Sequence, residues 1–240
     1  MRQFRAFFLS FLQMLSQIKK DSMLVVSCLA PILCGCVFKF LVPRLEELLC
    51  QELKLTECIS PYYGLIDLMF SFMAPMMFCF ASSMIILMEI DDKIINYYFV
   101  TPLGKRGYLI GRLILPAVLG ILMNFILFPI FTLSHPTLLI MSCYIILAGV
   151  MGLIVCLMVI SLSSNKVEGM AIVKLSGIIM LGLFVPYFIQ HKVQYLTAIL
   201  PSYWLGRFAI DTRIGYVIIT LMLSLVWILG FSRMFQRKIM

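Results

Sequence analysis

Side chains able to carry out chemistry are few in this sequence and lie far apart. The only histidines are His135 and His191, and both fall in connections between long apolar stretches. Neither a Ser/His pair nor a histidine-based metal site can therefore be assembled within those stretches. Gly104 and Lys105 are followed by Arg106, so the phosphate-binding pattern G-x-x-x-x-G-K-[ST] is absent as well. We predict that the chain is not an enzyme and binds no cofactor itself.

The eight cysteines are too scattered for a metal site. Cys34 and Cys36 are two residues apart, so on a helix they point to different faces and chelate poorly. Cys50 and Cys58 share one polar connection. An oxidising exterior would allow a disulfide there, whereas a reducing surrounding would leave two thiols. We predict no metal and leave both states of this pair open.

Six long apolar stretches dominate the chain. Of its 240 residues 62% are hydrophobic and 12% charged, and the mean hydropathy is +1.06. A soluble domain carries roughly 25% charged residues, and a helix needs about 20 apolar residues to cross a bilayer. The alternation typical of barrel strands is absent. We predict an all-α integral membrane protein, a single domain over residues 1–240, with six transmembrane helices: Ser22–Pro43, Gly64–Met88, Tyr108–Thr132, Leu138–Leu162, Met170–Ile189 and Ile214–Ser232.

The basic residues predict the orientation. With the N-terminus inside, the inner segments hold eleven Lys and Arg and the outer segments five. This is the positive-inside distribution, so both termini are expected in the cytoplasm. Three others, Lys39, Arg112 and Lys174, lie near span ends and are expected to snorkel. The formal charge of +8 thus predicts contact with anionic membrane lipid and not with nucleic acid.

Acidic residues avoid the middle of the membrane. Asp67 lies three residues into the second span and Glu89 one residue past its end. A transporter driven by protons or sodium needs titratable groups within the membrane. That class is therefore disfavoured.

Two further elements flank the spans. Residues 1–20 carry apolar side chains at helical spacing, which predicts an amphipathic helix lying in the interface. Residues 89–107 connect spans two and three. At about 100° per residue, Ile90, Ile94, Tyr97 and Tyr98 fall on one side of a short helix. Either this helix docks on a partner, or it is an interfacial helix without one.

The order of these features resembles the permease subunits of type-2 ABC exporters. An acid closes span two, an amphipathic stretch follows, and Thr-Pro-Leu precedes Tyr108-Leu-Ile-Gly-Arg-Leu. The polar stretch 163–171 and the connection 190–213, expected to be re-entrant, agree with that family. The resemblance implies a six-span half-transporter without its own ATPase domain. The residues that would couple it to an ATPase are Glu89, Ile90, Asp91, Asp92, Lys93, Ile94, Tyr97, Tyr98, Thr101, Pro102 and Leu103.

The resemblance also implies partners and a location. Two copies of an ABC ATP-binding subunit would carry ATP and Mg²⁺, and a second permease, most simply an identical one, would complete the complex. The expected place is the plasma membrane of a bacterium, and the expected cargo is a small amphipathic compound, a lipid, or an antimicrobial peptide or drug. Candidate polar residues along the substrate path are Ser71, Ser82, Ser83 and Asn124. The alternative is a membrane scaffold or sensor whose flat helix docks a partner without transport.

Overall fold

The computed structural model describes residues 12–13, 16–54, 58–100, 104–189 and 191–239. Within this part of the chain the regular structure is helical, and six helices are long and apolar enough to cross a membrane. The prediction of a six-span all-α protein is confirmed. Five spans are single helices, namely α2 (Ser22–Leu53), α3 (Tyr63–Asp91), α7 (Leu138–Leu162), α8 (Lys166–Phe188) and α10 (Ile214–Ile239). The third span is composite, because α5 (Gly104–Leu109) continues through a π-helical turn (Ile110–Ile114) into α6 (Leu115–Phe131).

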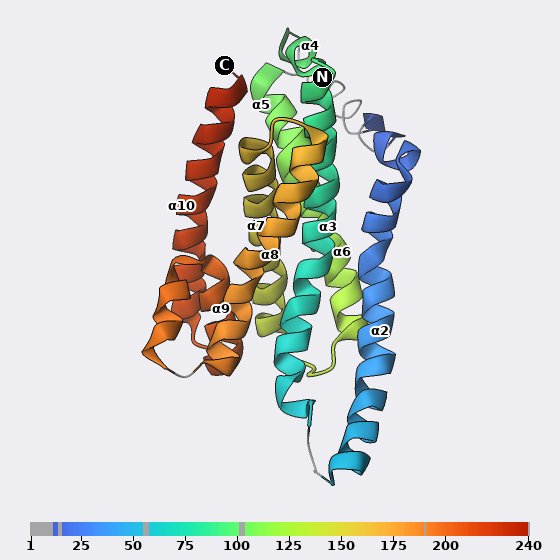
Figure 1. The fold of residues 1–240 in the computed structure, drawn as a ribbon, viewed down its shortest axis with the longest axis vertical. Coiled ribbons are helices and arrows are strands. Elements are labelled where there is room, and N and C mark those ends of the chain that lie inside the picture. The colour runs from blue at the N-terminus through green and yellow to red at the C-terminus, as the bar shows by residue number, and fades with distance from the viewer. Residues whose placement is uncertain (1–11, 14–15, 55–57, 101–103, 190, 240) are drawn as a thin grey trace.

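Helices α3 and α7 form the centre of the bundle. In each of them, 72% of the most apolar 18-residue stretch is buried within the chain, compared with 11% of the corresponding stretch in α2 and α10. Figure 1 shows α2 and α10 at opposite sides of the bundle, with the remaining spans between them. The large apolar side chains that α2 and α10 expose are therefore available to lipid or to another subunit.

Helices α6 and α7 pack closely against a proline in the middle of α3. Pro75 has no N–H, so the carbonyl of Ser71 loses its helical partner. The Asn124 amide of α6 donates to that carbonyl at 2.5 Å and restores the bond. Glycines allow α6 and α7 to approach: a Cβ on Gly120 would lie 2.6 Å from the Pro75 Cα, and one on Gly152 would lie 3.0 Å from the Pro75 carbonyl oxygen.

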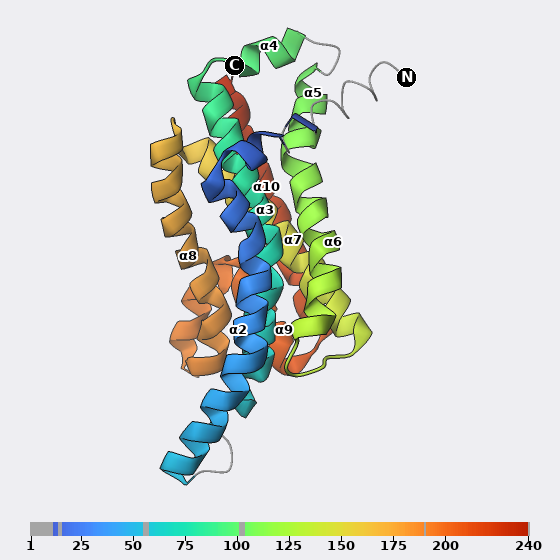
Figure 2. The same ribbon diagram turned by 90° about the vertical axis from the view of Figure 1, so that its right-hand side faces the viewer.

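The bundle has two different ends. At one end lie α4 (Ile95–Val100), the start of α2, the end of α10 and the turn between α7 and α8. Helix α4 lies across this end in Figure 2. An ion pair of 2.8 Å joins Asp21, which caps α2, to Lys166 at the start of α8. We call this the α4 end.

The opposite end, which we call the α9 end, holds the connection after α8. It contains a 3-10 helix, η3 (Lys192–Ile199), and α9 (Pro201–Asp211). Helix α9 folds back against α8: the Ser202 hydroxyl donates to the Ile179 carbonyl, and a Cβ on Gly206 would lie 2.6 Å from the Leu183 carbonyl oxygen. A short turn, η1 (Ser60–Tyr62), precedes α3 at the same end.

Candidate functional site

The connection between α3 and the third span is not one continuous helix. Helix α3 extends to Asp91, a turn follows, and α4 begins at Ile95. Within the turn Lys93 adopts a left-handed backbone conformation with φ of 58°. The prediction that Ile90, Ile94, Tyr97 and Tyr98 share one helical side is therefore wrong, because the left-handed residue reorients the chain between the first of them and the last two.

The side chains of this connection divide into an outer and an inner group. Asp92, Lys93, Ile94 and Tyr97 are exposed, and the side chain of Tyr97 reaches 71% exposure. We call these four residues the α4 surface. Ile90, in contrast, packs against the buried core.

Asp91, although exposed, is engaged within the chain, because its carboxylate accepts from the Lys166 backbone N–H at 3.1 Å. Thr101, Pro102 and Leu103 lie outside the described residues. Among the predicted coupling residues that the structure describes, the α4 surface is thus the exposed part that a partner could contact.

Glu89 faces into the protein. It is 1% exposed, forms an ion pair with Arg112, and accepts from the Tyr108 hydroxyl at 2.6 Å. The expectation that Arg112 snorkels is wrong, because this side chain is also 1% exposed and turns toward Glu89. The carboxylate attracts the guanidinium more strongly inside the protein than the headgroup region would, since the local dielectric is low. Glu89 is therefore an internal residue and not part of a docking surface.

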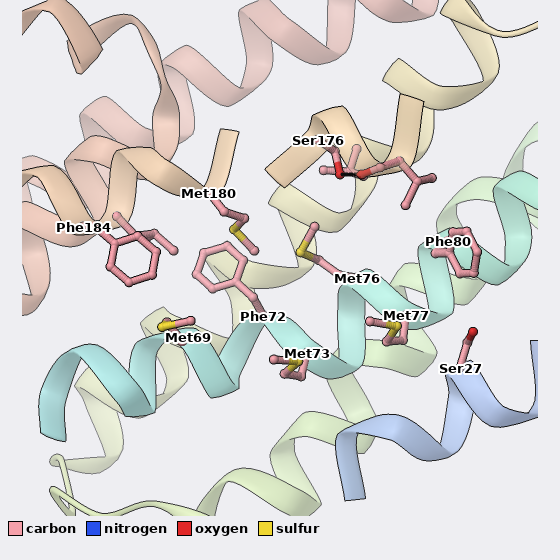
Figure 3. A pocket seen from close by; sticks show the side chains of 13 residues that line it. Ser27, Met69, Phe72, Met73, Met76, Met77, Phe80, Ser176, Met180 and Phe184 are labelled. Atoms are coloured by element: carbon pink, nitrogen blue, oxygen red, sulfur yellow. Dashed lines mark hydrogen bonds between the residues drawn. The ribbon is translucent and has the colours of Figure 1, made fainter. Parts of the chain in front are cut away.

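An apolar cavity of about 400 Å³ lies between α2, α3 and α8, with one lining residue from α7. Figure 3 shows methionine and phenylalanine side chains of α3 and α8 turned toward it. Its walls carry five methionines and three phenylalanines: Met69, Met73, Met76, Met77, Met180, Phe72, Phe80 and Phe184. Only two of its described lining residues, Ser27 and Ser176, have polar side chains. The site can hold an apolar or aromatic molecule and offers it few hydrogen bonds.

The four predicted polar path residues do not line this cavity. The hydroxyls of Ser71 and Ser83 donate to carbonyls of their own helix, at 2.6 Å to Leu68 and 2.7 Å to Phe80. Ser82 donates to the Arg112 carbonyl, and the Asn124 amide donates to the Ser71 carbonyl that Pro75 leaves without a helical partner. All four are at most 1% exposed and serve helix packing. Sequence reasoning could have found the role of Asn124, because a proline within a span leaves a carbonyl that needs a donor.

Cys50 and Cys58 are both free thiols, and their side chains interact with each other at the α9 end. The two residues are brought together, as their shared connection suggested. The disulfide is not formed in this structure.

Six helices that can cross a membrane, four of which line an apolar cavity, define a multi-pass membrane protein with room for a small molecule. Residues 14–232 match a family described as "Fluoroquinolones export permease protein Rv2686c-like". The match covers most of the chain, which therefore belongs to this family of export permeases. No curated protein and no solved structure matches the chain. Membership of the export permease family indicates a transport subunit rather than an enzyme.

Proposed function

We propose that this chain is the membrane subunit of an ATP-driven exporter and that it moves a fluoroquinolone, or a drug of similar shape, out of a bacterial cell. Membership of an export permease family is the observation that carries the proposal. The sequence contains no phosphate-binding loop, so a separate ABC subunit, in two copies, would bind ATP and Mg²⁺. Membership of this family also favours export over the scaffold or sensor alternative.

The cavity supports the substrate class. Sites for drug-sized ligands have volumes of about 300–1,000 Å³ and mostly apolar walls, and this cavity of about 400 Å³ falls within that range. Fluoroquinolones contain a fused aromatic ring system. Methionine thioethers contact aromatic rings favourably and adapt to their outline because the side chain is flexible. The walls would hold the ring system, leaving its charged groups to the cavity mouth.

The α4 surface is the proposed contact with the ATPase. It combines an acid, a base and two apolar side chains, Asp92, Lys93, Ile94 and Tyr97, and all four are exposed. The excess of basic residues at this end favours the cytoplasm as its location. An ATPase that binds there differently in its two nucleotide states would shift the permease between two conformations.

A second permease, most simply an identical chain, would complete the particle. Among the small residues of α7 and α8, Gly149, Gly152 and Gly182 already face other helices of the same chain. Gly177 of α8 has open space beside it, with nothing within 4 Å. A small residue on an exposed face permits close approach of another helix in the membrane, which supports this face as one contact between subunits.

The test is fluoroquinolone accumulation in cells that contain the chain and a candidate ATPase. Met180→Trp places a bulky ring in the cavity, and Met222→Trp makes the same exchange on α10, where Met222 is 64% exposed. We expect Met180→Trp to raise accumulation to the level of cells without the transporter and Met222→Trp to leave export unchanged. Full export by Met180→Trp, at an equal amount of protein in the membrane, would show that the drug does not use this cavity.

A further inference from the structure

A buried ion pair connects the ends of two spans beside α4. The Glu89 carboxylate lies in the last turn of α3 and the Arg112 guanidinium in the third span, and both residues are 1% exposed. Buried ion pairs seldom add stability, since apolar residues of similar volume often do as well or better. Charged residues within membrane segments usually mark function. Stability alone therefore gives little reason for this pair.

Helix α4 is attached to the pair through Tyr98. The Tyr98 ring centre lies 5.8 Å from the Arg112 guanidinium carbon and 5.5 Å from the centre of the Tyr108 ring. A cation within about 6 Å of a ring centre is attracted to the ring face. The preceding residue, Tyr97, is 71% exposed. Two neighbouring tyrosines thus face opposite ways, one away from the protein and one toward the ion pair.

The backbone around Arg112 is a π-helical turn. Residues Ile110–Ile114 form this turn, and the Ser82 hydroxyl of α3 donates to the Arg112 carbonyl inside it. Single π-helical turns are rare and occur frequently at functional sites. The third span is therefore irregular at the residue that the ion pair holds.

The pair also connects to helices that line the cavity. Glu89 belongs to α3, which supplies Met69, Phe72, Met73, Met76, Met77 and Phe80 to the cavity wall. Gln17, which precedes α2, donates to the Glu89 carboxylate, and α2 supplies Ser27. A movement of Glu89 relative to Arg112 would therefore displace two of the helices around the substrate.

We propose that Glu89, Arg112 and Tyr98 form a relay that transmits displacement of α4 to the helices lining the cavity. The inference rests on the proposed function, because the displacement is taken to come from the partner ATPase. In this relay Tyr98 follows α4, Arg112 follows Tyr98 by attraction to its ring, and Glu89 follows Arg112 through the ion pair. All three are positioning residues and touch neither drug nor nucleotide.

The relay predicts that binding of the ATPase and use of its energy can be separated. We would reconstitute the permease with its ATPase in proteoliposomes and measure ATPase binding, ATP hydrolysis and drug moved per ATP hydrolysed. Tyr98→Leu, which removes the ring, should bind the ATPase normally but move about tenfold less drug per ATP, within the usual range for coupling between two sites. Tyr98→Phe keeps the ring, losing only the hydrogen bonds of the hydroxyl, and should restore coupling. The matched exposed variant Tyr97→Leu should instead weaken ATPase binding.

A double variant separates the relay from a structural role. Glu89→Met with Arg112→Met replaces both charges with apolar groups, which is commonly neutral for folding. This variant should reach the membrane in normal amount, bind the ATPase and remain uncoupled. Wild-type drug transport per ATP in the double variant or in Tyr98→Leu would overturn the relay. If the wild-type chain moves no drug with ATP, the proposed function itself fails, and the relay fails with it.

Discussion

The packing of α6 against Pro75 leads to a quantitative prediction for Gly120→Ala. The added Cβ would lie 2.6 Å from the Pro75 Cα, 3.2 Å from its nitrogen and 3.4 Å from the Ala74 carbonyl oxygen. All three neighbours are backbone atoms, so no side chain can rotate away. To reach ordinary contact, α6 must move outward by roughly 0.8 Å, from 2.6 to 3.4 Å. Such overpacking costs about 1–3 kcal/mol.

Part of that cost is offset, because alanine favours a helix over glycine by about 1 kcal/mol. The expected net loss is about 0–2 kcal/mol in the free energy of unfolding, whereas an alanine with free space around it should gain up to about 1 kcal/mol. Gly230→Ala is the matched control, since Gly230 lies within α10 and has nothing within 4 Å. Reversible unfolding in mixed micelles would measure both variants. Equal stability of the two would show that α6 does not contact the Pro75 backbone as described.

Two further predictions concern the ends of the bundle. In a cysteine-free background, cysteines placed at the exposed positions Asp92 and Glu47 should label from the cytoplasm and from the exterior respectively, and labelling of both from one side would refute the six-span topology. At the α4 end, the hydrogen bond from Lys166 holds the pKa of Asp21 below its usual value. The pair therefore stabilises the protein above about pH 4, and this contribution is lost as the pH falls through the lowered pKa. Asp21→Asn keeps a helix-capping side chain but removes the charge. The difference in unfolding free energy between this variant and the wild type should vanish at low pH, and a difference that persisted there would not come from the ion pair.

The spans could be predicted from the sequence because hydropathy alone determines them. The fourth span was predicted at Leu138–Leu162, and α7 has the same bounds. The first was predicted to end at Pro43, but α2 continues to Leu53. The apolar composition of a span indicates which residues lie in lipid. The helix itself can continue past the end of that apolar stretch, as α2 does. At the α9 end, Glu46 of this extension accepts from the Ser60 backbone N–H at 2.9 Å and from the Tyr63 hydroxyl.

The site was less predictable, because it depends on which residues of different helices meet. Glu89 and Arg112 are 23 residues apart and carry no shared pattern, so their pairing follows only once α3 and the third span are in register. The prediction of one apolar helical side over residues 90–98 is wrong for a local reason. Nothing in the sequence indicates that Lys93 adopts a left-handed backbone conformation. The cavity lies between three helices, and the residue type alone does not distinguish its methionines from methionines that face lipid.

Transport by purified components tests the central claim most directly. The permease and its candidate ATPase would be reconstituted in proteoliposomes, and fluoroquinolone movement would be followed with and without ATP and Mg²⁺. We predict movement that requires the ATPase and stops when its nucleotide site is inactivated, with no response to a proton gradient alone. Drug movement that is driven by a proton gradient and persists without the ATPase would contradict the account.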